Sequence, residues 1–359
     1  MAIHVTPNGT AAGTGLSWSS PVDLQTALGM AVSGEEIWAL GDNNVWGVSG
    51  TYPITSTLNM NVSDVRLYGG FRGTETNILQ RNAYIACNVA AFPNYFPFPS
   101  ILRGVASLGQ SIINVMANDC VVDGFLIENG GGAGVQGGGL YAGAGLSNLR
   151  FENLVFKNNS ADNGGGMFLD DCDAELINSF FYRNNATNHG GGLYLQNCNN
   201  GVVVVNVLFA KNGVDADGNL TQNGGAIYMN NSTVEVINNT IADNQAVDVN
   251  SKGIYADNSN WRMHNSILFP DIFTSTNVPF IISECLLNQR PQTAQNCFFP
   301  PVSPDFVNSA ASNYRLQATS PCINAGDPTY VTPQLTITDL EGRPRFTALM
   351  QIDLGAFQH

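Results

Sequence analysis

The sequence predicts an all-β protein built as a parallel β-helix, a solenoid of stacked coils, and three observations support this. A motif of up to three glycines followed by an apolar and an aromatic residue recurs at aromatic-to-aromatic spacings of 27, 26, 34 and 27 residues, and its last copy is a remnant with a single glycine. A second motif, Asn-x-x-apolar-x-x-Asn, follows each copy of the first. The segments between the motifs are short, alternate apolar with polar residues, and are rich in β-branched and aromatic residues, which is typical of strands.

The glycine motif ends in an aromatic residue in five successive repeats. These residues are Tyr141, Phe168, Tyr194, Tyr228 and Tyr255. A repeat of this length can hold two or three short strands joined by Gly and Asn turns, which is one coil of a β-helix. Because coils stack about 4.8 Å apart, equivalent residues of successive coils form columns along the axis.

The asparagine motif predicts two further kinds of column. Its clearest copies begin at Asn153, Asn178, Asn206 and Asn238. We expect its apolar members, among them Phe156, Phe181 and Phe209, to stack in the core. We expect its asparagines to pass amide hydrogen bonds from coil to coil.

The two ends of the chain depart from the repeat. Ser20 followed by Pro21 is typical of a helix start, so we predict a capping helix over about 21–32 that covers the open first coil. We assign 1–304 to the β-helix with this N-terminal cap, and 305–359 to an irregular C-terminal cap. The longest repeat contains an insertion, Val214 to Gln222, which must loop out of a turn.

The charge of the chain excludes two classes of partner. It has 28 acidic against 14 basic residues and a net charge of -14. Such a polyanion gains nothing from counterion release on nucleic acid, and an anionic membrane surface repels it. No apolar run reaches the length of a membrane span. The low charge content and few lysines favour an extracellular or cell-surface protein, so we expect that a signal peptide has been removed.

The repeats resemble those of the right-handed parallel β-helix proteins of the polymorphic outer-membrane protein type. The segment from Leu67 to Thr76 is similar to one that those proteins carry before their repeats. The segments 313–316, 320–327 and 352–357 resemble the end of the bacterial choice-of-anchor Q domain. The resemblance implies a right-handed, pectate-lyase-like fold in a secreted or surface-anchored bacterial protein. It implies little about activity, because that fold hosts lyases, hydrolases, adhesins and phage tailspikes.

The residues do not form a familiar catalytic set. The Arg-x-Pro-x-x-Arg segment of pectate lyases is missing, as is the set of Asp, His and Arg-x-Lys residues of polygalacturonase-like hydrolases. We interpret Asp170, Asp171 and Asp173 as solvated turn charges, His189 as a turn residue on an Asn column, and His264 as a surface residue. The leading hypothesis is therefore a non-enzymatic scaffold for adhesion or glycan binding. The alternatives are a polysaccharide lyase or glycoside hydrolase, and a phage tailspike or filament protein.

The inserted loop is a candidate calcium site. Asp215, Asp217 and Asn219 place oxygen ligands at alternate positions around a glycine, as in the first half of a calcium loop. The closing Glu is missing, and Asp-Gly-Asn is also ordinary turn chemistry.

The seven cysteines show no metal-ligand spacing. Cys172 and Cys198 are expected to be stacked neighbours, and in-register stacking is poor geometry for a disulfide. Cys285 and Cys297 bracket a loop and are the pair that we predict to be bonded.

The five aromatic residues are the candidate binding site. Each has an apolar residue on either side, and strand side chains alternate between faces. If the flanking residues point into the core, the rings point outward and form a stripe along five coils. Exposed aromatic faces in a row suit sugar rings, so this stripe is the candidate glycan site. The alternatives are that a bend after the glycines turns the rings into the core, or that the loop 214–222 or a cap covers the stripe.

Overall fold

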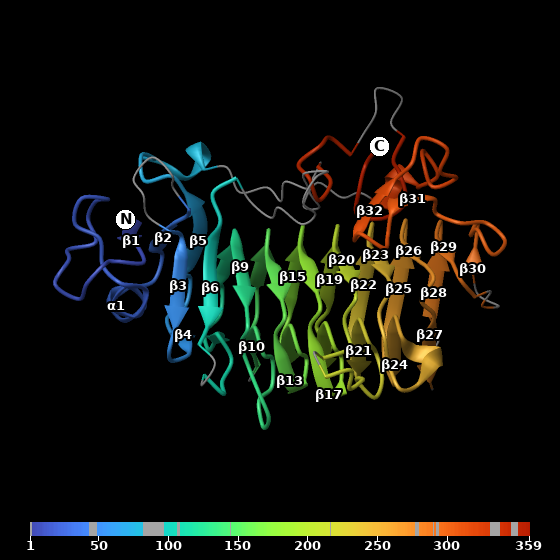
Figure 1. The fold of residues 1–359 in the computed structure, drawn as a ribbon, viewed down its shortest axis with the longest axis horizontal. Helices are drawn as coiled ribbons and strands as arrows, with labels where there is room; N and C mark the ends of the chain where they lie inside the picture. The colour runs from blue at the N-terminus through green and yellow to red at the C-terminus, as the bar shows by residue number, and fades with distance from the viewer. Residues whose placement is uncertain are drawn as a thin grey trace.

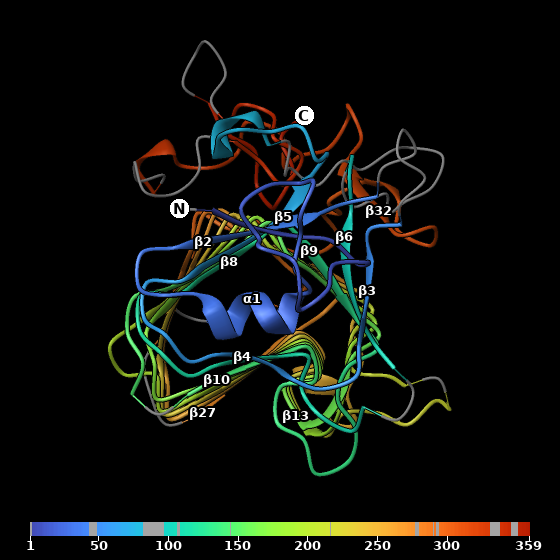
Figure 2. The same cartoon turned by 90° about the vertical axis from the view of Figure 1, so that its left-hand side faces the viewer.

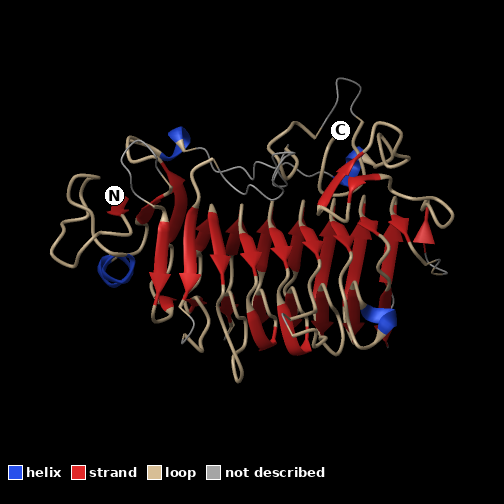
Figure 3. Cartoon of the chain, viewed as in Figure 1, coloured by secondary structure: helices blue, strands red, loops and turns tan. Residues whose placement is uncertain are grey.

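The protein is a right-handed parallel β-helix, as predicted (Figures 1 and 3). The computed structural model describes residues 2–42, 49–81, 97–105, 108–143, 145–215, 217–276, 280–289, 291, 294–330, 338–345 and 351–359. A regular coil contributes one strand to each of three sheets, which contain eleven, nine and eight strands. Strands pair with the equivalent strands of the neighbouring coils, and every pair in these sheets is parallel.

In each sheet, neighbouring strands follow one another in chain order along the axis of the β-helix. The eleven-stranded sheet contains β1 (Ala2–Val5), β2 (Glu36–Leu40), β5 (Arg66–Phe71), β8 (Val121–Asp123), β11 (Leu149–Glu152), β15 (Ala174–Ile177), β19 (Val202–Val205), β22 (Thr233–Ile237), β25 (Asn260–His264), β28 (Phe280–Ser283) and β30 (Ala294–Gln295). The nine-stranded sheet contains β3 (Thr51–Ile54), β6 (Ser100–Gly104), β9 (Phe125–Glu128), β12 (Val155–Lys157), β16 (Phe180–Tyr182), β20 (Leu208–Ala210), β23 (Thr240–Ala242), β26 (Ile267–Leu268) and β29 (Leu286–Leu287). The eight-stranded sheet contains β4 (Leu58–Met60), β7 (Ile113–Val115), β10 (Leu140–Ala142), β14 (Met167–Asp170), β18 (Leu193–Gln196), β21 (Ile227–Asn230), β24 (Ile254–Asp257) and β27 (Phe273–Thr276).

The asparagine motif forms the turn between the eleven- and nine-stranded sheets. Its first residue turns the chain in the left-handed conformation, with φ of 50° at Asn153, 47° at Asn178 and 55° at Asn206. Asparagine is among the few non-glycine residues that adopt this conformation readily. The apolar member points inward, and the rings of Phe156 and Phe181 stack at 4.6 Å between centroids, as predicted.

The last residue of the motif forms a buried column, called here the amide ladder. Its members are Asn159, Asn184, Asn212, Asn244 and Asp271. Each side-chain amide donates to the oxygen of the next member, at 3.0, 3.0, 2.9 and 2.6 Å in that order. Every member is at most 2 % exposed. The predicted coil-to-coil amide bonds are therefore present, and the ladder ends on a carboxylate.

The glycines provide space for the core rings beside the ladder. A Cβ at Gly166 would lie 2.7 Å from the ring of Phe181, closer than real side chains pack. Gly164, with φ of 64°, makes the left-handed turn that starts the motif. The two glycines therefore have separate roles, one in packing and one in the backbone turn.

The N-terminal helix is shorter than predicted. Helix α1 (Leu24–Met30) starts at Asp23, whose carboxylate accepts from the backbone N–H of Thr26 at 2.9 Å. The prediction of a start at Pro21 is wrong, because Val22 still forms a parallel bridge with Val5. Helix α1 lies across the open end of the β-helix, as expected (Figure 2). No helix of the described residues is long and apolar enough to cross a membrane.

The C-terminal segment lies along the side of the β-helix, and the prediction that it caps the last coil is wrong in this respect (Figures 1 and 2). It contains one antiparallel pair, β31 (Phe306–Asn308) and β32 (Asn313–Leu316), and is otherwise irregular. Its Tyr314 and Phe357 pack on Phe180 and Leu208, which point outward from the nine-stranded sheet. An apolar outer face needs such a cover, since water would otherwise contact it.

Candidate functional site

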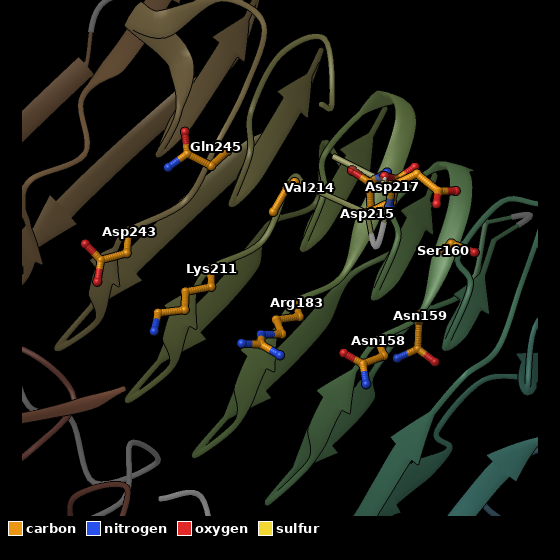
Figure 4. Close-up of a pocket in the computed structure, with 11 residues that line it drawn as sticks. Asn158, Asn159, Ser160, Arg183, Lys211, Val214, Asp215, Asp217, Asp243 and Gln245 are labelled. Carbon is orange, nitrogen blue, oxygen red and sulfur yellow. Dashed lines mark hydrogen bonds between the residues drawn. The ribbon is translucent and has the colours of Figure 1, made fainter. Parts of the chain in front are cut away.

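A groove runs along one edge of the nine-stranded sheet, where four successive strands end (Figure 4). Its floor is formed by Asn158, Arg183, Lys211 and Asp243, each of which directly follows a strand. All four adopt the left-handed conformation, with φ between 52° and 59°. Each directly precedes a member of the amide ladder. The ladder side chains point inward, whereas the side chains of these four residues line the groove (Figure 4).

The groove has a volume of about 1030 Å³ and lies beside two irregular segments. The insertion Val214 to Gln222 contributes Asp215 and Asp217 to its lining. The C-terminal segment holds the floor from the other side. The Lys211 ammonium donates to the Ala310 carbonyl at 3.0 Å and to Ser312 Oγ at 2.8 Å. The Tyr314 hydroxyl donates to Asp243 Oδ2 at 2.7 Å.

Most arginines of the described residues form an ion pair with a carboxylate, and the two cations of the floor, Arg183 and Lys211, do not. Arg103 pairs with Glu128 at 2.6 Å, and Arg150 pairs with Glu152 at 2.8 Å. Within the described part of the chain, no carboxylate forms an ion pair with Arg183 or Lys211. Arg183 is exposed, and its guanidinium carbon lies 5.1 Å from the ring centroid of Tyr182. The groove therefore contains two adjacent cations that form no ion pair among the described residues, together with the carboxylates of Asp215, Asp217 and Asp243.

The predicted calcium residues come together, but they bind one another. Asp215 Oδ1 accepts from the backbone N–H groups of Asp217 and Asn219 at 3.0 and 2.8 Å. Its Oδ2 accepts from the Asn219 side chain at 2.9 Å. The hydrogen bonds from Asn219 lower the pKa of Asp215. Among the described residues, no group of three or more His, Cys, Asp or Glu side chains could hold a metal ion. The residues present do not fit a calcium site, since the carboxylate closes its own loop.

The five aromatic residues form one column on the outside of the eight-stranded sheet, called here the aromatic column. The flanking residues, such as Leu193 and Leu195, are fully buried in the main core, so the rings point outward as predicted. Along the column, ring centroids are 5.6, 4.7, 4.9 and 5.2 Å apart. The rings thus cover one another face to face.

The expected exposure of the aromatic column is wrong for its centre. Phe168, Tyr194 and Tyr228 are 4, 6 and 7 % exposed. The ring of His189 also stacks on Tyr228, at 4.5 Å between centroids. Burial raises the pKa of both tyrosines. Because each ring face is covered by the next ring, the centre cannot offer flat faces to sugars.

The two histidines have different environments. His189 pairs with Asn163 on one side and Asn223 on the other, so it occupies an Asn column as predicted. His264 was expected on the surface, yet it is 5 % exposed. The ring of Tyr330, from the C-terminal segment, stacks on it at 3.8 Å, and Ser283 Oγ lies 2.7 Å from its Nδ1. Burial, with a contribution from Arg262, lowers the pKa of His264 to about 4.

The cysteines described in the structure are free thiols, so the predicted disulfide between Cys285 and Cys297 is wrong. The strand register places Ile282 beside Ala294 and Leu286 beside Phe298. Cys285 and Cys297 are therefore stacked in register, like Cys172 and Cys198. This is the arrangement that disfavours a disulfide. The seventh cysteine, Cys87, lies outside the described residues.

Sequence reasoning missed the groove, although a signal for it was present. Arg183 and Lys211 occupy the position before the last asparagine of the repeat motif. Asn158 and Asp243 occupy the same position in the neighbouring repeats. Three successive charged residues in this column, two cations and Asp243, indicate that the column has a role other than stacking between coils.

Among the comparisons with known proteins, the one with solved structures finds matches. No family model and no curated protein matches the chain, so the resemblance to the polymorphic outer-membrane protein and choice-of-anchor Q types stays a prediction. The pectate lyase Pel9A is 16 % identical with a TM-score of 0.47, and the match covers 100 % of this chain and 96 % of that one. A pectin methylesterase from Aspergillus niger is 13 % identical with a TM-score of 0.31, covering 89 and 90 %. ORF18 of Geobacillus virus E2 is 11 % identical with a TM-score of 0.36, covering 83 and 60 %. At these values the matches carry no argument about activity.

Proposed function

We propose that the protein is a non-enzymatic, extracellular β-helix scaffold that binds an extended acidic glycan in the groove. The observation that carries this proposal is the pair of cations on adjacent coils, Arg183 and Lys211, which have no acidic partner among the described residues. The chain has twice as many acidic residues as basic ones, 28 against 14, so a carboxylate of the protein itself could have paired with each of these two cations. An external anion is the alternative partner.

Two of the four floor residues, Arg183 and Lys211, have the chemistry to bind a uronic acid, whereas the carboxylates of the groove would repel one, so we place the acidic sugar over the two cations. A guanidinium binds a carboxylate through two parallel hydrogen bonds, and an ammonium acts as a compact charge beside it. The two cations are one coil apart, about 4.8 Å, so they can contact one extended polymer together. The amides of Asn158 and Gln245 can donate to and accept from sugar hydroxyls.

The hydrogen bonds of the floor favour binding over catalysis. The Lys211 ammonium donates to two neutral oxygens, which hold it in place. Asp243 is likewise held by the Tyr314 hydroxyl. A proton-abstracting base needs a free lone pair, which an ammonium lacks. The enzymatic alternative remains a polysaccharide lyase, in which Lys211 or Arg183 would have to lose its proton before it could act as the base, or a glycoside hydrolase.

The test is calorimetric titration with polygalacturonate oligomers and, in parallel, neutral galactan oligomers of matched length. We expect the acidic oligomer to bind, and Arg183→Ala combined with Lys211→Ala to weaken binding at least tenfold. Arg262→Ala is the matched control, because Arg262 is an exposed cation of the eleven-stranded sheet, with its side chain 52 % accessible. Equal binding by the double variant, or no binding by the unmodified protein, would contradict the proposal. New reducing ends or unsaturated products would instead establish the enzymatic alternative.

A further inference from the structure

The aromatic column ends at a polar position. Tyr141 pairs in register with Phe168 on one side and with Asn114 on the other. Its ring stacks on Phe168 at 5.6 Å with an interplanar angle of 24°. Beyond Asn114, the column continues with Asn59. One face of the Tyr141 ring is therefore not covered by another ring, unlike the rings in the centre of the column.

A hollow of about 400 Å³ lies next to this ring. Its lining includes Tyr141, Asn114, Gln110, Gln136 and Thr57, and none of the lining residues carries a charge. Tyr141 is only half-buried, in contrast to Phe168. A hollow of this size, with one aromatic wall and several amides, is within the range of small-molecule sites.

The polar groups of the hollow are partly fixed and partly unused. Asn114 Oδ1 is buried and accepts no hydrogen bond from any residue that the structure describes. Such an acceptor is unfavourable unless a ligand or water completes it. The side-chain oxygen of Gln136 accepts from Asn163 at 3.0 Å, and that of Gln110 accepts from Thr57 at 3.0 Å. These bonds orient both amides and leave their N–H groups available.

We propose that this hollow binds a neutral pyranose sugar, stacked on the open face of Tyr141. The apolar face of the sugar would take the place that another ring occupies elsewhere in the column. Its hydroxyls would accept from the side-chain amides of Gln110 and Gln136, and a rotation of the Asn114 side chain would bring its unpartnered oxygen within reach of a further hydroxyl. The absence of charge in the lining selects a neutral sugar over a uronic acid. This site lies on the eight-stranded sheet and does not depend on the proposed function of the groove.

The first test uses neutral hexasaccharides of glucose, mannose, galactose and xylose as probes in calorimetric titrations. We expect at least one of them to bind, and Tyr141→Ala to weaken it at least tenfold. Tyr255→Ala is the matched control, since Tyr255 is the half-buried ring at the other end of the same column. Failure of all four probes to bind, or equal losses in both variants, would overturn the proposal.

A second variant separates binding from folding. Asn114→Tyr would fill the hollow and extend the aromatic column by one ring. We expect this variant to lose sugar binding while its melting temperature is unchanged or raised. Sugar binding retained by Asn114→Tyr would refute the site. Polygalacturonate binding should be unchanged in every variant of the hollow, so failure here is distinguishable from failure of the groove.

Discussion

The amide ladder and the aromatic column are both stacks of like side chains on successive coils, one inside the β-helix and one outside. In the ladder, amides 2.6–3.0 Å apart satisfy one another without water. In the aromatic column, rings 4.7–5.6 Å apart cover one another's faces. In both cases the coil spacing lets like side chains of neighbouring coils bind one another, through hydrogen bonds in the ladder and through ring faces in the aromatic column. These groups are then not available to a ligand. A regular column is therefore a structural element, and binding sites are to be sought where a column is interrupted.

The interruptions carry the unusual chemistry of this protein. The ladder ends on the carboxylate of Asp271, which is buried. The aromatic column ends at Asn114, where the hollow lies. The outward column beside the ladder changes to Arg183 and Lys211, where the groove lies.

The largest effect is expected inside the ladder. Asn212→Ala removes the acceptor for both the backbone and side-chain N–H groups of Asn184, and the donor to the Phe181 carbonyl. Because the site is dry, we expect a loss of about 3–5 kcal/mol in the free energy of unfolding, measured with urea. The exposed Asn188→Ala is the control and should change it by less than about 0.5 kcal/mol. A loss below about 1 kcal/mol for Asn212→Ala would show that the ladder is not stabilising.

The end of the ladder should respond in the opposite direction. Burial raises the pKa of Asp271 to about 7 from its usual 3.8. The folded state therefore binds this proton more tightly than the unfolded chain does. The stability that the bound proton contributes is fully present below about pH 4 and is lost as the pH rises through about 7. Asp271→Asn should keep the acceptor and remove this loss, stabilising the protein by about 2–4 kcal/mol at pH 8 and hardly at pH 4. Urea unfolding at the two pH values measures the difference, and equal effects at both would contradict it.

A smaller loss is expected in the aromatic column. Tyr194→Ala removes a ring stacked on both faces, so we expect a loss of about 2–3 kcal/mol. Tyr255→Ala removes one stacked face and should cost about half as much. Thermal unfolding of both variants checks the ratio. If Tyr194→Ala left the melting temperature unchanged, the rings would be a surface stripe after all.

The smallest effect is expected from calcium. The loop at Asp215 closes on its own donors, as the columns do, and leaves no ready set of ligands. Millimolar calcium added to a chelator-treated sample should shift the melting temperature by less than about 1 °C, because a ligand stabilises only the state that it binds. A shift of several degrees would restore the calcium site.

Much of the fold was predictable because the repeat states it several times. Each asparagine motif encodes a left-handed turn, a core residue and a ladder member within seven residues. The start of α1 was not predictable in this way, because the bridge between Val5 and Val22 is a tertiary contact. The side-on packing of the C-terminal segment did have a signal. Pairs such as Phe180-Phe181 and Leu208-Phe209 place apolar residues on both faces of one strand, which is typical of strands covered on both sides.

The candidate site was predictable only in part. Strand alternation gave the outward direction of Tyr194 and its equivalents correctly. Their burial was not predictable from strand alternation, which describes a single coil, whereas the rings of the next coil supply the cover. The burial of His264 was missed for a related reason, since Tyr330 is distant in the sequence. The exposure of side chains in such a column can be predicted only when the residues of the neighbouring coils are considered together.

The C-terminal segment also changes how the protein should unfold. In a solenoid, contacts join nearest neighbours, so coils can open from the ends one after another. Here, residues such as Tyr314 and Phe357 belong to one apolar cluster with outward residues from β9, β12, β16, β20 and β23. Opening any one of these coils also disturbs the packing of a segment shared with the others. We expect the segment to link these coils, so that they unfold together in one cooperative transition and not one after another.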